Sequence, residues 1–165
     1  MFQIDIMNEK NYPVDPISLQ QAALTVLQGQ SERLEGSLTV VIEDDEAVAA
    51  LNSRYRGIDS ATDVLSFPSE MPMMPIEMMD EDALPYLGDL IIAYPYALAQ
   101  AQREGHDAMQ SFSLLVVHGT LHLLGYDHDT LENRAEMWAA QETALMALGI
   151  STAIVPSLEG SIDDH

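Results

Sequence analysis

One segment, residues 112–124, is apolar on nearly every side and yet contains two histidines, His118 and His122. A helix that is hydrophobic all round has to be buried, so the other elements of the chain must pack around this one. Because the two histidines are four residues apart, a helical conformation places both imidazoles on one face, one turn apart. The chain is therefore predicted to bury a central helix that presents two polar rings on the same side.

A third histidine completes a cluster, because residues 118–128 hold three of the five histidines of the chain. Gly125 can adopt a positive φ at little cost and turn the chain back after the helix, which lets His128 approach the same point from outside. Three neutral imidazoles bind zinc and leave a fourth position open for water, as in catalytic sites; nickel and copper also suit such ligands. The alternative is a set of ordinary core histidines, but burying three imidazoles without compensation is costly. We therefore predict a site for one zinc ion.

The spacing of these histidines equals that of the zinc-peptidase signature H-E-x-x-H-x-x-G-x-x-H, with one departure. Gly119 stands where those peptidases have the glutamate that acts as general base. A peptidase mechanism of that type therefore lacks its base, although zinc alone lowers the pKa of bound water to roughly 7. Three neutral ligands leave the full charge of the metal in place, which favours an anionic substrate such as a phosphodiester.

The charge of the whole chain counts against a nucleic-acid partner. Six basic residues face 27 acidic ones, and the formal net charge is -21. Such a surface repels nucleic acid overall. A positive field at a local metal site answers part of this objection.

The composition also limits the class of protein. The chain has no cysteine, so it has neither a disulfide framework nor a thiolate that could bind metal or act as nucleophile. Residues 1–10 do not resemble a secretory signal, and no run of about 18 apolar residues predicts a membrane span. We therefore expect a cytoplasmic protein without a membrane partner.

The periodicity of apolar residues predicts an α+β (mixed α/β) fold, with a single catalytic domain over residues 1–150 and a small, roughly four-stranded sheet packed by helices. Alternating or β-branched runs predict strands at 2–6, 38–42, 63–67 and 87–93. Helical spacing predicts helices between 15 and 29, between 44 and 57, at 96–103 and 112–124, and from 129 to about 149. The zinc site is expected on the buried central helix and the turn after it.

Capping signals and an apolar stripe define the last two helices. Asp107 and Asp129 are each followed, three residues later, by a glutamine or glutamate, which predicts two capping boxes. The last helix is expected to bury a stripe formed by Leu131, Ala135, Trp138 and Leu145.

Polar segments outside these elements are predicted to be surface features. Residues 68–86 are rich in methionine and acidic residues, contain prolines and have no steady period, which indicates a mobile loop; a methionine-rich lip for a partner is the alternative. Residues 151–165 are predicted to form a flexible tail. His106 and His165 lie outside the cluster and are predicted to be solvated.

Further motifs precede the histidine cluster. The cluster reads H-G-x-L-H-L-x-G-Y-D-H, and before it come L-N-x-x-Y-R-G at 51–57, T-D-V-L-S-F at 62–67 and G-D-L at 88–90. This combination resembles the YbeY family of metal-dependent ribosomal-RNA endonucleases over about residues 40–147. The resemblance implies a single α/β domain, a zinc site with His118, His122 and His128 as ligands, and cleavage of single-stranded ribosomal RNA. It also implies roles in ribosomal-RNA maturation and ribosome quality control, with ribosomal particles or ribosome-associated proteins as partners.

The resemblance also assigns a role to Arg56, which matches an arginine that the family uses near the active site. Its planar guanidinium suits bidentate contact with phosphate; without the resemblance, a surface salt bridge is the simpler interpretation. Asp127 either orients a ligand histidine or caps the following turn.

Four further residues keep two interpretations each. Asp63 and Ser66 either contact substrate or serve the turn and the strand pairing. Tyr55 and Tyr126 either stack on bases or pack against a helix.

Two other functions remain open. The first is a zinc hydrolase of another substrate class, such as a metallopeptidase, against which Gly119 counts. The second is a non-enzymatic ribosome-assembly factor that uses zinc only for folding, against which an open fourth coordination position would count.

Overall fold

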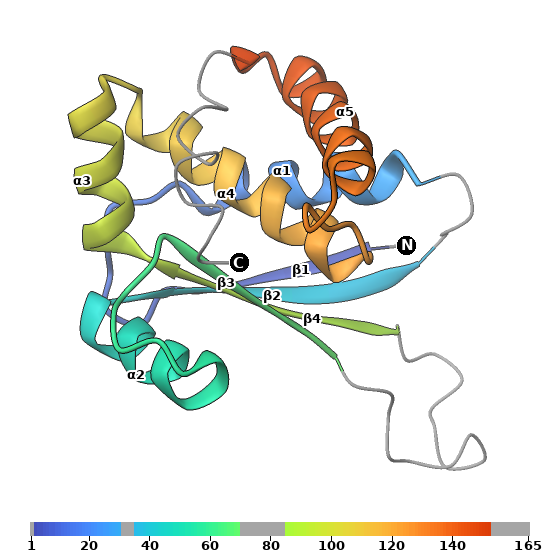
Figure 1. The fold of residues 1–165 in the computed structure, drawn as a ribbon. Helices are drawn as coiled ribbons and strands as arrows, with labels where there is room; N and C mark the ends of the chain where they lie inside the picture. The colour runs from blue at the N-terminus through green and yellow to red at the C-terminus, as the bar shows by residue number, and fades with distance from the viewer. Residues whose placement is uncertain (1, 31–34, 70–84, 153–165) are drawn as a thin grey trace.

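A computed structural model describes residues 2–30, 35–69 and 85–152 of the chain. The described residues form one α+β domain around a four-stranded mixed sheet (Figure 1), which confirms the predicted fold class. The strands are β1 (Phe2–Met7), β2 (Gly36–Glu43), β3 (Val64–Pro68) and β4 (Tyr86–Ala93). The helices are α1 (Pro16–Gln28), α2 (Asp45–Arg56), α3 (Tyr94–Glu104), α4 (Ala108–Leu123) and α5 (Leu131–Leu148). No described helix is both long and apolar enough to cross a membrane.

The sheet has the strand order β1-β2-β4-β3, in which β3 alone runs antiparallel to its neighbour. Helices α1, α4 and α5 lie on one side of it and α2 lies on the other (Figure 1). Strand β4 is therefore buried on both faces: Leu90 and Ile92 belong to the main core under α4, whereas Ile91 and Ala93 join Val48 of α2 in a smaller cluster.

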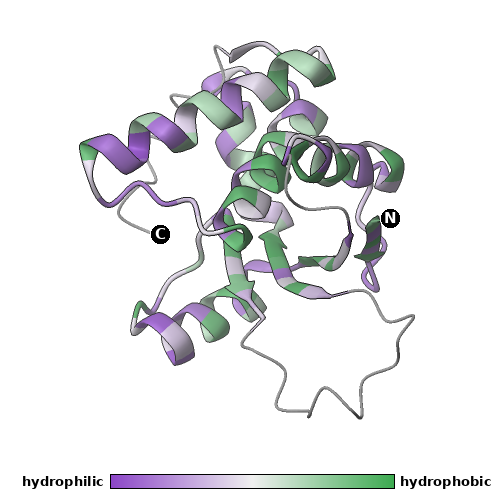
Figure 2. Ribbon diagram, turned by 90° about the vertical axis from the view of Figure 1, so that its right-hand side faces the viewer, coloured by the Kyte–Doolittle hydropathy of each residue, from purple (hydrophilic) through white to green (hydrophobic). Residues whose placement is uncertain are grey.

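Helix α4 occupies the centre of the larger layer. Every residue from Phe112 to Leu121 is buried, and α4 contacts β3, β4, α1, α3 and α5. Hydrophobic residues gather between the helices and the sheet, whereas the outer helices carry more hydrophilic ones (Figure 2). The prediction of a buried central helix is thus confirmed.

Two glycines allow the elements around α4 to approach closely. A Cβ atom on Gly119 would lie 2.7 Å from Cδ2 of Leu90, so the missing side chain brings α4 down onto β4. Gly88 has φ 141°, and a Cβ atom there would collide with the carbonyl oxygen of Phe67 on β3. Both positions hold the end of α4 against the β3–β4 pair.

Three predicted helix starts are confirmed by their caps. Asp15 accepts a hydrogen bond from the backbone N–H of Ile17, Asp44 from Ala47, and Asp107 from Gln110. These bonds satisfy N–H groups that the first turn of a helix leaves without partners.

The predicted start of α5 is wrong, and its predicted buried stripe is confirmed only at Leu145. Thr130, not Asp129, caps the helix by accepting from the backbone N–H of Asn133. Leu131 is 85% exposed and Ala135 is also exposed, and Trp138 is only half-buried. The face that packs consists of Met137, Gln141, Ala144 and Leu145. The buried face includes a glutamine, so the pattern of apolar residues alone did not identify it. The prediction was therefore wrong for the first half of the helix.

Three predictions for the surface have different outcomes. The ring of His106 is half-buried, with its Nδ1 atom 3.7 Å from a carboxylate oxygen of Glu104, so the prediction that it is solvated is wrong. The ends of the expected loop, Pro68 and Tyr86, belong to β3 and β4. Residues 70–84 of that loop, residues 153–165 of the expected tail and with them His165 lie outside the described residues.

Candidate metal centre and adjoining cleft

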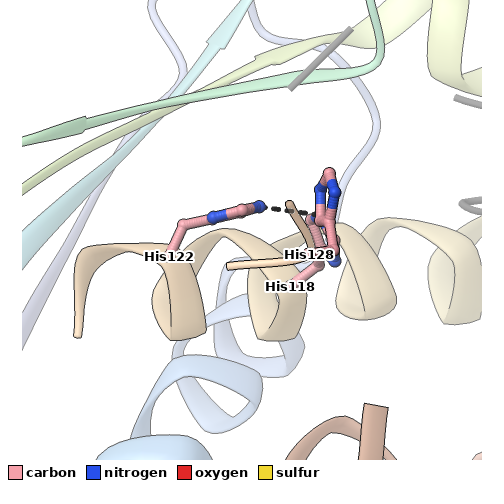
Figure 3. Close-up of side chains that lie close together, drawn as sticks. All are labelled: His118, His122 and His128. Carbon is pink, nitrogen blue, oxygen red and sulfur yellow. Dashed lines mark hydrogen bonds between the residues drawn. The ribbon is translucent and has the colours of Figure 1, made fainter. Parts of the chain in front are cut away.

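Three imidazoles converge beside the end of α4. His118 and His122 lie one turn apart on α4, and His128 approaches from the segment after Gly125, whose φ is 100° (Figure 3). One ligand atom of each ring lies within 4.8 Å of the other two. The two rings on α4 face each other through their Nε2 atoms, which are 3.1 Å apart.

These positions fit a metal ion. Zinc bonds of about 2.0–2.1 Å in tetrahedral geometry separate two ligand nitrogens by about 3.3 Å, close to the 3.1 Å between the Nε2 atoms of His118 and His122. His118 and His128 are buried and His122 is half-buried, so the site opens on one side. Among the described residues, these three histidines are the one group of three or more His, Cys, Asp or Glu side chains close enough to hold a metal ion together.

Neighbouring groups hold the rings through their outer nitrogens. Nδ1 of His118 lies 3.0 Å from Oε1 of Gln141, and Nδ1 of His122 lies 3.1 Å from the carbonyl oxygen of Tyr126. The indole of Trp138 meets the rings of His118 and His128 edge-on, with centroids 5.9 and 5.7 Å away. Bonds at Nδ1 leave Nε2 directed at the centre of the cluster, the arrangement that outer hydrogen bonds impose on metal ligands.

A cleft of about 380 Å³ lies between the end of α4 and the residues of α2 and β3, and His122 of the cluster lines it. It is lined by Arg56, Leu65, Ser66, Phe67, Pro68, His122, Gly125, Tyr126 and Asp127. The histidine wall comes from α4 and the turn after it, and the opposite wall comes from the end of α2 and from β3. A molecule in this cleft would contact both walls at once.

The α2 wall contributes a cation and aromatic surface. The buried Nη1 atom of Arg56 has no hydrogen-bond partner among the described residues, and the ion pairs found there do not include this side chain. Tyr55 is 58% exposed and meets Phe67 edge-on at 5.3 Å, while the guanidinium of Arg54 lies 5.3 Å above its ring. The described residues thus offer no partner that would support a surface salt bridge for Arg56.

Comparisons with known proteins assign the family. The family model described as "Endoribonuclease YbeY" matches residues 4–149. The chain belongs to the endoribonuclease YbeY family. A relative of that name from Moorella thermoacetica is 46% identical over 134 residues, which cover 80% of this chain and 83% of the relative. Another, from Brevibacillus brevis, is 37% identical over 159 residues, which cover 92% of this chain and 99% of the relative.

A solved structure supports the fold. The solution structure of a protein from Thermotoga maritima aligns with a TM-score of 0.53 at 21% identity, covering 89% of this chain and 91% of that one. At this identity the likeness concerns the fold alone.

The structure places the remaining candidate residues in different surroundings. Ser66 and Tyr126 line the cleft. Asp63 is fully buried and accepts from the backbone N–H of Val64, which favours its role in the turn and the strand pairing over contact with substrate. The carboxylate of Asp127 accepts from the backbone N–H of His128 at 2.8 Å, a bond of the turn rather than of a ring.

Sequence reasoning missed two residues of the centre. No role was predicted for Gln141, and Trp138 was expected only to pack in an apolar stripe. A buried glutamine among the apolar positions of α5 is the signal that could have pointed to a polar partner, since buried polar groups are normally hydrogen-bonded.

Proposed function

We propose that the chain is a zinc-dependent endoribonuclease that cuts single-stranded RNA, with His118, His122 and His128 as metal ligands and Arg56 as a catalytic residue. The observation that carries the proposal is one cleft that contains both His122 of the histidine cluster and Arg56. The relatives bear the name endoribonuclease, and an RNA phosphodiester suits a site built from a cation and neutral ligands.

The ligand set favours zinc in an electrophilic role. When bound, zinc would act as a Lewis acid on a phosphodiester oxygen and would lower the pKa of a bound water to roughly 7. The histidines are neutral ligands, so they leave the charge of the ion undiminished. Nickel and copper also suit three imidazoles, and a purified sample could carry either.

Arg56 is suited to bind the phosphate. Its guanidinium can donate two parallel hydrogen bonds to phosphate oxygens and stabilise negative charge that develops during cleavage. The Nη1 atom without a partner among the described residues supports this role, because a buried donor gains most from a ligand that completes its hydrogen bonding.

The aromatic side chains support a preference for single strands. Bases that are not paired can stack on exposed rings, and the half-exposed Phe67 connects the cleft to the exposed ring of Tyr55. A duplex would keep its bases stacked on one another and could not use this surface.

The net charge of -21 indicates how the RNA is presented. Few lysines or arginines are available to release counterions, so free RNA should bind weakly and with a shallow salt dependence. We propose that a ribosomal particle or a ribosome-associated protein holds the strand, which agrees with roles in ribosomal-RNA maturation and ribosome quality control.

A metallopeptidase function has less support. A side chain at position 119 would run into Leu90, so the glutamate of the peptidase signature does not fit this packing of α4 on β4. A protein that uses zinc only for folding would not need a cleft with a cation beside the ligands.

The test compares substrates with and without metal. Zinc-loaded protein is incubated with unstructured RNA, duplex RNA and unfolded peptide, alone and with ribosomal particles, and each reaction is repeated with a chelator. Chelator-sensitive cleavage of unstructured RNA is expected. Chelator-sensitive peptide cleavage without any RNA cleavage would overturn the proposal.

A further inference from the structure

Gln141 is a fully buried polar residue on α5 that faces the histidine cluster. Its Oε1 atom lies 3.0 Å from Nδ1 of His118 on α4. The pair is separated by 23 residues in sequence, so this contact joins two helices directly at the centre.

The chemistry of the amide oxygen determines the tautomer of the ring. A carbonyl oxygen only accepts hydrogen bonds, so Nδ1 of His118 has to carry the proton. In a neutral imidazole the other nitrogen, Nε2, then keeps its lone pair. That atom is the one that faces Nε2 of His122.

A purely structural role explains this glutamine poorly. Its Nε2 atom is buried without a hydrogen-bond partner among the described residues, and an amide donor in that state costs stability. An apolar side chain of similar size would fill the same space in the Met137–Leu145 face without that cost. The bond to His118 is what the amide provides.

We propose that Gln141 is a positioning residue that fixes His118 in the tautomer offering Nε2 to the metal. The inference rests on the proposed metal site. Outer partners of ligand histidines are often carboxylates, whereas an amide does the same task without charge. Gln141 thereby leaves the positive field at the centre intact for an anionic substrate, which a carboxylate at this position would weaken.

Three variants separate these roles. Gln141→Met keeps the volume and removes the acceptor, and Gln141→Glu keeps an acceptor and adds a carboxyl group. Thr120→Val is the matched control, because Thr120 is fully buried on α4, the helix of His118, and among the described residues its hydroxyl donates only to the carbonyl oxygen of Val116. Each protein is measured for zinc affinity by competition with a chelator, for denaturant midpoint without metal, and for the tautomer of His118 by imidazole ¹⁵N shifts.

The expected pattern is specific to positioning. Gln141→Met should lower zinc affinity by about 10- to 100-fold, without a lower metal-free denaturant midpoint than the wild type. Thr120→Val should keep zinc affinity, and Gln141→Glu should restore it. In the wild type without metal, the proton of His118 should reside on Nδ1. At saturating zinc, Gln141→Glu should cleave RNA more slowly than the wild type.

Each contrary result overturns a defined part. A proton on Nε2 of His118, or wild-type zinc affinity in Gln141→Met, would remove the positioning role. Wild-type cleavage by Gln141→Glu would remove the argument about charge. Because the tautomer and zinc affinity are read without RNA, a wild type that binds zinc but cleaves no RNA would refute the proposed activity and leave the positioning role standing.

Discussion

The two walls of the cleft differ in how firmly the protein holds them. On the α4–α5 wall, His118 is bonded to a buried glutamine and His122 to a backbone carbonyl. On the α2–β3 wall, Arg56 keeps a buried donor without a partner among the described residues, and the exposed ring of Tyr55 lies next to Phe67 beside the cleft. The first wall holds two of its imidazoles through bonds at Nδ1, whereas the second leaves a buried guanidinium donor for a ligand.

This difference predicts two kinds of variant. Changes on the histidine wall should alter metal content first and activity as a consequence. Changes on the α2 wall should leave metal content intact and alter only what happens to RNA. Variants whose effects cross between the two walls would contradict the division.

The largest effect is expected from His122→Ala. It removes one of three ligands, so tight zinc binding and RNA cleavage should both be lost. The thermal midpoint in excess zinc should also fall, because a bound ligand at about 100 times its Kd stabilises the native state by roughly 2.7 kcal/mol. Metal analysis and thermal unfolding provide the measurements. His106→Ala, outside the cluster, is the control, and an unchanged zinc content in His122→Ala would refute the ligand assignment.

The next effect is expected on the opposite wall. Arg56→Ala should keep zinc content and folding but slow RNA cleavage by about 10²-fold or more, the scale for removing one stabiliser of transition-state charge. Arg56→Lys should recover only part of the rate, because lysine lacks the planar fork. Single-turnover cleavage assays give the rates, and Arg103→Ala, in the last turn of α3, controls for loss of a positive charge. Cleavage by Arg56→Ala at the wild-type rate would mean that the arginine is a surface residue.

A smaller effect is expected for Tyr55→Ala. Stacking of a base on an aromatic ring contributes about 1–3 kcal/mol, so KM for unstructured RNA should rise roughly 5-fold or more while zinc content stays constant. Tyr55→Phe keeps the ring and should behave like the wild type. If Tyr55→Ala keeps the wild-type KM as Tyr55→Phe does, the ring serves only to pack against Phe67.

The sequence predicted one wall better than the other, for physical reasons. The α4 wall follows from local rules: i, i+4 spacing, a helix with an apolar surface all round, and a glycine that turns the chain. Strand pairing follows from contacts distant in sequence, so the order β1-β2-β4-β3 was not predictable from the runs that identified the strands.

The residues that support the centre were hidden for the same reason. The bond from Gln141 to His118 spans 23 positions, and no local pattern links a glutamine on one helix to a histidine on another. Arg56 could be selected only through its resemblance to a family motif, since neither its periodicity nor its charge distinguishes it from other arginines.

The smallest effect is expected for Asp127, which lines the cleft on the histidine wall and directly precedes His128. Its carboxylate accepts from the backbone N–H of His128, and asparagine can accept the same bond. Asp127→Asn should therefore hold zinc within about threefold of the wild-type affinity, well short of the roughly 10- to 100-fold loss expected for a group that orients a ligand ring. Asp127→Ala loses the turn bond, worth about 0.5–1.5 kcal/mol, and should bind zinc more weakly than Asp127→Asn. Removing one negative charge from the cleft should also strengthen RNA binding at low salt. Chelator competition and RNA titrations measure both effects, and a large loss of zinc affinity in Asp127→Asn would show that charge on this residue orients the metal site.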